Sequence, residues 1–158
     1  MTDPKTISQR GTSFADQPHA YDPVTQSRLF DGVVGKRAAA FIADAILVLV
    51  LVFLFGLVTF GLGWVLLPAI LVVFLVYNAV TIGGKNSATP GQRLMGLEVR
   101  MWSGGKVTPL IAAFHALLFW FAAGTFVLWL VDVLWVFFDE RKRTVHDILA
   151  SVVVINRT

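Results

Sequence analysis

The stretch from Lys36 to Phe60 constrains this chain more than any other. It opens with two cations, Lys36 and Arg37, and then continues almost entirely apolar to Phe60. A helix that crosses a bilayer needs about 20 apolar residues, so the stretch predicts a membrane span. One acid, Asp44, lies inside the apolar run. Since an Asp at the centre of a span costs about 2.5 to 3.5 kcal/mol on insertion scales, we expect Asp44 to have a partner.

Composition extends the membrane assignment to the whole chain. Of its 158 residues, 56% are hydrophobic and only 15% are charged, and the mean hydropathy is +0.74. These values lie outside the range of soluble domains. The cations lie at the ends of apolar runs, which indicates membrane topology rather than nucleic-acid binding. Cysteine is absent, so a disulfide framework and a thiolate metal site are excluded.

The chain divides into a tail and a membrane domain. Residues 1–30 are rich in Thr, Ser, Asp, Gln and Pro and are predicted to be a disordered cytoplasmic tail rather than a signal peptide. The membrane domain covers 31–156. Its first two spans are predicted at about 38–60 and 64–82, joined by a turn at Gly61-Leu62-Gly63, and a polar connection follows outside the bilayer core.

The apolar run at 109–138 leaves two topologies open. As a helix it is longer than one span but shorter than two spans with a turn. The positive-inside rule favours a hairpin of two short tilted or re-entrant half-helices that breaks near Gly124, because cations precede the first span, follow the second and recur after Phe138. The alternative is one long tilted helix with an external C-terminus. The predicted fold class is an all-α polytopic membrane protein with 3 to 4 transmembrane segments, roughly one for every 20 apolar residues.

The C-terminal segment combines a helix signal with a strand signal. Thr144 can cap a short helix that carries Asp147. Residues 151–155 are rich in β-branched side chains and have strand character. This strand could pair with 96–101 on the membrane surface, although no sequence feature specifies that pairing.

Polar side chains inside the spans are the candidate ligand- or ion-binding residues. Asp44, Asn78 and His115 each lie about 10 Å or less along the helix from the polar edge of their span, which predicts one polar layer in the cytoplasmic half of the membrane. Asp132 joins this layer if the last apolar run is a hairpin. We expect Asp44 to pair across a helix interface with Arg93 or His115. Each residue also has a structural interpretation, because interhelical hydrogen bonds hold membrane bundles together.

Enzyme signatures are not visible in the sequence. It lacks a Gly-x-Ser-x-Gly elbow, a His-Glu-x-x-His zinc helix and a Walker loop. The three histidines, His19, His115 and His146, are too scattered to indicate a metal site. We therefore expect no catalytic residues, no cofactor and no metal site.

Three motifs coincide with those of a known family. Arg37 opens the first span and Asp44 lies inside it, Ala88 to Leu97 reads ATPGQRLMGL, and Arg143 to Ala150 reads RTVHDILA. With these motifs the chain resembles the RDD family of small bacterial membrane proteins, named for one Arg and two Asp. By position, Arg37, Asp44 and Asp147 match the residues of that name.

The resemblance covers about residues 30–156 and departs at two positions. Gln92 and His115 stand where many relatives carry a Lys and an Arg. The resemblance implies transport of an unidentified ligand, and cation/proton antiport is associated with some members of the family.

Two hypotheses for function remain open. The first is a multi-pass inner-membrane protein that moves or exchanges a small solute or cation, with Asp44 as the ion- or proton-responsive acid. Arg37 and Arg93 would then hold charge partners, and Asp147 would tether the C-terminal segment to them. The second is a non-transporting membrane adaptor or assembly factor with structural Arg/Asp pairs. Both imply the lipid bilayer and either a homo-oligomer or another membrane protein as partners, and neither implies nucleic acid.

Overall fold

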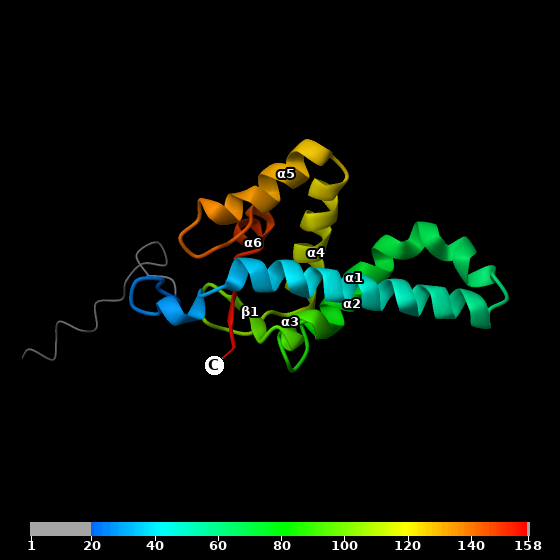
Figure 1. Cartoon of the computed structure of the whole chain (residues 1–158), viewed down its shortest axis with the longest axis horizontal. Helices are drawn as coiled ribbons and strands as arrows, with labels where there is room; N and C mark the ends of the chain where they lie inside the picture. Colours follow the sequence, from blue (N-terminus) through cyan, green and yellow to red (C-terminus); the bar gives the residue numbers. More distant parts are fainter. Residues whose placement is uncertain (1–19, 158) are drawn as a thin grey trace, which may run out of the picture.

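The computed structural model describes residues 20–157, apart from the side chains of residues 66–69, and this part of the chain is mostly helical (Figure 1). The first α-helix is the longest, and the later elements pack along it. The helices and strands are, in chain order, η2 Ser27–Leu29, α1 Val33–Val58, η3 Leu62–Ala69, α2 Ile70–Thr81, α3 Pro90–Leu94, β1 Leu97–Met101, α4 Pro109–Ala123, α5 Phe126–Leu134, η4 Trp135–Phe137, α6 Val145–Leu149 and β2 Val152–Asn156.

The chain reverses at the far end of α1, where the sequence predicted a turn. Helix α1 ends at Val58, and Phe60 and Gly61 have φ values of 54° and 89°. Glycine tolerates this left-handed backbone because it has no Cβ. The chain then doubles back through η3 and α2 (Figure 1), and Phe53 stacks on Trp64 with ring centroids 6.2 Å apart. The first two predicted spans thus correspond to α1 and to η3 followed by α2.

The last apolar run is broken into two helices, as the hairpin alternative required. Helix α4 ends at Ala123, and Thr125 has an extended backbone (φ −129°, ψ 113°) before α5 begins. Glycine at 124 weakens the helix at this point because it is a poor helix former. Helix α5 returns toward the start of α1 (Figure 1). The alternative of one long helix is therefore wrong.

Within the described residues, β1 and β2 form a two-stranded antiparallel sheet, so the expectation of a purely helical domain was incomplete. Leu97 lies opposite Asn156, Val99 opposite Val154, and Met101 opposite Val152. This confirms the pairing that the strand signals had only made conceivable. One face of the sheet, with Val152 and Val154, belongs to the main hydrophobic core. That core also contains Val33, Ala40, Ile82, Leu97, Val99, Val107, Ala112 and Ala150.

The other face of the sheet is covered by residues that the sequence assigned to the tail. Phe30 is buried against Val153 and Ile155, with Tyr21 packed beside them. The backbone N–H of Ala20 donates to the Trp102 carbonyl over 2.9 Å. The predicted tail 1–30 is therefore too long at its C-terminal end, because the alternating side chains of β2 present apolar groups on both faces and both need cover. Residues 1–19 lie outside the described part of the chain.

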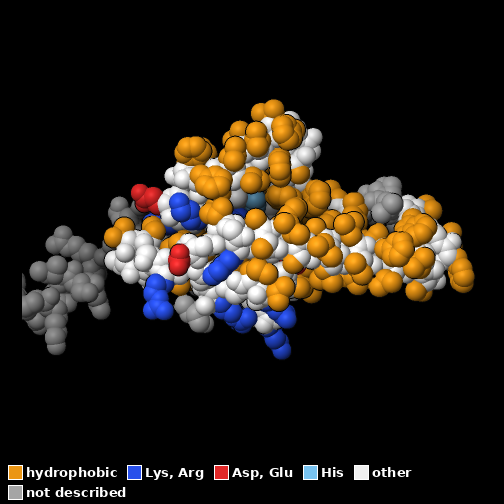
Figure 2. Space-filling view, in the orientation of Figure 1, with side chains coloured by type: hydrophobic (Ala, Val, Ile, Leu, Met, Phe, Trp, Pro, Cys, Tyr) orange, Lys and Arg blue, Asp and Glu red, His pale blue; other side chains and the backbone are white. Residues whose placement is uncertain are grey.

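The surface separates into an apolar part and a charged part. The helical run Ser27–Val58 is long and apolar enough to cross a membrane: its 18-residue apolar window has a mean hydropathy of 2.9, and only 11% of that window is buried. Shorter apolar helices lie at Ile70–Thr81, Pro109–Ala123 and Phe126–Phe137. In Figure 2, hydrophobic side chains cover the far half of α1 and the top of α4 and α5, whereas Lys and Arg gather around the start of α1 and the region of α3.

Candidate functional site

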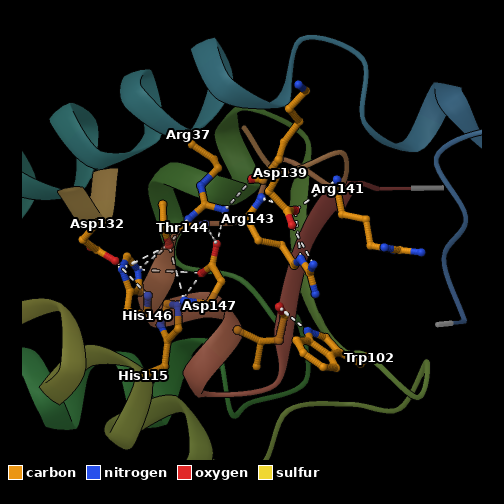
Figure 3. A network of polar contacts seen from close by, with 12 residues as sticks. Arg37, Trp102, His115, Asp132, Asp139, Arg141, Arg143, Thr144, His146 and Asp147 are labelled. Carbon is orange, nitrogen blue, oxygen red and sulfur yellow. Dashed lines mark hydrogen bonds and ion pairs between the residues drawn. The ribbon is translucent and has the colours of Figure 1, made fainter. Parts of the chain in front are cut away.

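Arg37 reaches from the start of α1 to the short C-terminal helix α6 (Figure 3). Its Nη1 donates to Oδ2 of Asp147 over 2.5 Å, and its Nη2 lies 3.5 Å from the hydroxyl of Thr144. The side chain of Asp147 is fully buried, and that of Arg37 is 17% exposed. A buried carboxylate requires an opposite charge and hydrogen bonds to offset its desolvation. This pair joins two of the three residues that the family resemblance had singled out.

Asp147 also closes the first turn of α6. Its Oδ2 accepts a hydrogen bond from the backbone N–H of Thr144 over 3.0 Å, and the Thr144 hydroxyl accepts from the backbone N–H of Asp147, which completes a capping box. The predicted cap is thus confirmed. Burial raises the pKa of Asp147, but the charge of Arg37 and the hydrogen bond from His115 outweigh it and hold this pKa well below its usual range. Asp147 is therefore an anion at neutral pH.

Two histidines meet beside this carboxylate. Nε2 of His115, on α4, lies 2.7 Å from Oδ1 of Asp147. His146, on α6, places Nδ1 2.6 Å from Oδ2 of Asp132 and donates its backbone N–H to Oδ1 of the same residue over 2.8 Å. The two imidazole rings are 4.6 Å apart between centroids. We call His115, Asp132, His146 and Asp147, with Arg37, the acid–histidine cluster.

The premise that the histidines are too scattered for a metal site is wrong for two of them. Helices α4 and α6 bring His115 and His146 together although they are far apart in the sequence, and ligand-type atoms of these two residues and Asp147 lie within 4.8 Å of one another. His19 lies outside the described residues. Sequence spacing could not reveal this meeting, because it depends on how α4 and α6 pack.

Asp44 has a separate set of partners. It accepts hydrogen bonds from the Tyr77 hydroxyl over 2.7 Å, the Thr89 hydroxyl over 2.5 Å and the Gly91 backbone N–H over 2.7 Å. Its partners are therefore these three donors from α2 and the start of α3, rather than Arg93 or His115 as expected. Because each donor comes from a different residue on neighbouring elements, the carboxylate fastens α1 to both α2 and α3.

Gly91 lets α3 pack closely against α1. A Cβ at this position would collide with the Ala40 carbonyl oxygen and lie 2.8 Å from the Asp44 carboxyl carbon. We expect Gly91→Ala to lower the free energy of unfolding by about 1 to 3 kcal/mol, as overpacking of a tight contact does. Denaturation of the purified protein in mixed micelles, followed by tryptophan fluorescence, measures the change.

Gly35 provides the matched control for this substitution. It lies on α1, and a Cβ there would meet nothing within 4 Å. Gly35→Ala should leave stability unchanged or raise it by up to about 1 kcal/mol, because Ala is the better helix former. Equal effects of the two substitutions would contradict the close contact at Gly91.

The predicted polar layer is thus divided in two. Asp44 lies in one cluster, whereas His115 and Asp132 belong to the other. Asn78 joins neither, because its Nδ2 donates to the Phe74 carbonyl of its own helix over 2.9 Å. Arg93 is exposed on α3. The sequence prediction overlooked Tyr77 and Thr89, although Thr89 with Gln92 carries the signature of a capping box.

Asp139, which follows η4, is an acid outside the acid–histidine cluster. Both oxygens of Asp139 accept hydrogen bonds from the Arg143 guanidinium, over 2.7 and 2.9 Å, and Oδ2 also accepts from the backbone N–H of Arg141 (Figure 3). Burial raises the pKa of Asp139, but the bonds to Arg143 outweigh it, so the pKa is lowered. The guanidinium lies 4.8 Å from the centre of the Trp102 ring.

The lowered pKa of Asp139 predicts a pH dependence of stability. A carboxyl whose pKa is lower in the folded than in the unfolded state stabilises the fold above the unfolded value of about 3.9, and this contribution is lost as pH falls through the folded pKa. We expect Asp139→Asn to be less stable than the wild type at pH 7 and the difference to shrink below about pH 4. Unfolding in detergent across this range tests it. Glu140→Gln, at an exposed neighbouring acid, should show no such convergence.

The apolar surface and the buried polar clusters define an integral membrane protein. The sequence profile of the RDD family matches residues 32–151, so the chain belongs to this family, whose members are membrane proteins. This confirms the resemblance seen in the motifs. Comparisons with curated proteins and with solved structures gave no significant match.

Proposed function

We propose that this chain is a multi-pass inner-membrane protein that exchanges a small cation across the bilayer through its acid–histidine cluster. Its N-terminus would be cytoplasmic, since the cations gather around the start of α1 (Figure 2) and the positive-inside rule places such a region in the cytoplasm. The crossings would be α1, the η3–α2 segment and the α4–α5 hairpin. The role first assigned to Asp44 moves in this proposal to Asp132, an acid within the last apolar run.

The observation that carries the proposal is the alternation of acids and histidines. His115 contacts Asp147, and His146 contacts Asp132. His115, Asp132, His146 and Asp147 are all buried. Ionisable groups in membrane segments, such as His115 and Asp132 in the α4–α5 hairpin, are expensive, and they mark ion pathways and proton relays in pumps and transporters. Histidine suits such a relay because one ring nitrogen can accept a proton while the other donates one.

The proposal assigns no catalytic residue to the chain. It also requires an assembly, because so few helices can hardly enclose a pathway. The exposed apolar side chains of α1 and α2 offer surface for lipid and for a second copy or another membrane protein. They include Phe41, Ile46, Leu49, Phe53, Leu57, Val72 and Val76.

Flux through reconstituted vesicles tests the proposal. Proteoliposomes with a pH gradient and an internal pH dye should show proton movement when Na⁺, K⁺ or a divalent cation is added outside. Asp132→Asn should lower the rate at least tenfold, whereas Arg93→Gln, at an exposed position, should leave it unchanged. Rates equal to those of protein-free vesicles with every cation would contradict the proposal.

The second candidate is a membrane adaptor or assembly factor without transport. The observation favouring it is that Asp44 has three hydrogen-bond donors and Arg37 has an ion-pair partner, an arrangement that structural pairs would also have. This hypothesis predicts that substitutions at Asp44 and at Arg37 lower accumulation or complex formation while no flux is found. Co-purification of partners with the wild type, lost in Asp44→Asn, would support it.

A further inference from the structure

We propose that His115, His146 and Asp147 form a site for a divalent transition-metal ion of the Zn²⁺ type, and that Asp132 holds His146 in the orientation that binds it. The inference rests on the proposed function in one respect only: it names the class of cation that the cluster would exchange. Binding itself does not depend on transport and can be tested without it.

The three ligand atoms already converge. Nε2 of His115 lies 2.7 Å and Nε2 of His146 lies 3.7 Å from the same oxygen, Oδ1 of Asp147. One ligand atom from each of the three residues can be chosen so that all three lie within 4.8 Å of one another. Zinc binds His nitrogen and carboxylate oxygen at about 2.0 to 2.2 Å, so ligand atoms in a tetrahedral site are about 3.3 Å apart. The two observed separations, 2.7 and 3.7 Å, lie on either side of this value.

Asp132 provides the second observation that points to a ligand site. It contacts Nδ1 of His146 over 2.6 Å and accepts the backbone N–H of the same residue over 2.8 Å. The ring is thereby fixed with Nε2 directed toward Asp147 (Figure 3). A metal-binding His usually donates its other ring N–H to a carboxylate in this way, which sets its tautomer and makes it a stronger ligand.

Arg37 shapes the site without occupying it. Its Nη1 donates to Oδ2 of Asp147, so Oδ1 is the oxygen directed to the histidines. With both histidines neutral, Arg37 balances one of the two carboxylates, and a net negative charge remains. A buried negative charge favours a divalent cation. The Thr144 hydroxyl lies 3.3 Å from Nε2 of His146 and could bind a water that completes the coordination.

The donor set selects the kind of ion. Two imidazoles and one carboxylate suit Zn²⁺, Co²⁺ or Ni²⁺, whereas Mg²⁺ and Ca²⁺ prefer sites made of oxygen atoms. With three protein ligands, the site would keep a position open for water or an exchanging ligand, as non-structural zinc sites do. An open position would let an ion enter and leave.

Metal titration of the full-length protein in nanodiscs tests the site. Co²⁺ should give saturable visible absorption of a four-coordinate centre, and Zn²⁺ should displace it with unit stoichiometry. His115→Gln and His146→Gln should each weaken binding at least tenfold. Asp132→Asn should weaken it by about 10 to 100-fold, because it removes only the group that orients a ligand. His19→Ala, at the third histidine of the chain, should bind as the wild type does.

The outcomes separate this inference from the proposed function. The absence of saturable Co²⁺ or Zn²⁺ binding, or binding lost in His19→Ala and kept in His146→Gln, would overturn the site even if Na⁺ or K⁺ flux were found. Metal binding with no flux would support the site and contradict exchange. Unfolding curves check each variant, and if one histidine variant does not fold, the other decides. A folded Asp132→Asn with wild-type affinity and Co²⁺ spectrum would overturn its orienting role.

Discussion

Asp147→Asn is expected to lower the free energy of unfolding by about 3 to 5 kcal/mol, the cost of removing one partner from a buried ion pair. The amide keeps the size of the carboxylate, but the charge facing Arg37 is lost. Arg37 is then left mostly buried without its anion, and His115 loses a charged acceptor. Unfolding in detergent–SDS mixed micelles, followed by the fluorescence of the five tryptophans, measures this loss.

A double-mutant cycle isolates the pair from the rest of the site. Arg37→Met and Asp147→Asn each break the same contact, so the double variant should be more stable than the sum of the two single effects predicts. Asp31→Asn is the control, because Asp31 is exposed just before α1. Additive effects would show that Arg37 and Asp147 act independently. If either single substitution changed the free energy of unfolding by less than about 0.5 kcal/mol, the range of ordinary surface substitutions, the buried pair would be contradicted.

The features set by local chemistry were predictable from the sequence. The turn at Gly61 follows from a backbone conformation that glycine tolerates, and the break at Gly124 from its poor helix propensity. The capping box at Thr144 depends only on side chains three residues apart. The membrane assignment follows from apolar length alone. In each case the cause lies within a few neighbouring residues.

The features set by packing between distant segments were not predictable. The depth of Asp44 along its helix was estimated from the sequence, but depth does not determine which neighbouring helix it faces. Its donors come from α2 and the start of α3, whose rotation about their own axes the sequence does not define. The contact between α4 and α6 that joins His115 to Asp147 has the same origin. Tyr21 and Phe30 fell within the predicted tail 1–30, because only the sheet, formed by distant segments, gives them a surface to cover.

Each of the two polar clusters connects α1 to a different segment of the chain. Arg37 connects it to α6 and so to β2, and Asp44 connects it to α2 and the start of α3, which leads into β1. Since β1 and β2 pair with each other, the connections form a closed ring that includes α1 and the sheet. Arg37 and Asp44, which match the family's motif by position, thus attach α1 to the segments that carry both strands of the sheet.

The three hydrogen bonds to Asp44 determine how much its substitution should destabilise the fold. Asp44→Ala leaves three donors without an acceptor, those of Tyr77, Thr89 and Gly91. Thr89 and Gly91 are buried, and Tyr77 is half-buried. Because each unsatisfied buried donor costs about 1 to 3 kcal/mol, we expect a total loss of about 3 kcal/mol in the free energy of unfolding. Tyr77→Phe removes only one of the three bonds and should cost about 1 kcal/mol. The same micelle unfolding assay compares the two variants.

Asp44→Asn separates the structural role of this acid from the ion-responsive role that the sequence suggested. The amide fills the same space but cannot take a proton, and it can accept with only one oxygen. If the role of Asp44 is structural, the variant accumulates less, yet its flux per folded molecule equals that of the wild type. If instead flux falls at least tenfold while the unfolding free energy is unchanged, Asp44 titrates during exchange and the structural assignment is wrong. The three donors around the carboxylate favour the first result, because a group that must gain and lose a proton would have to break at least one of these bonds in every cycle.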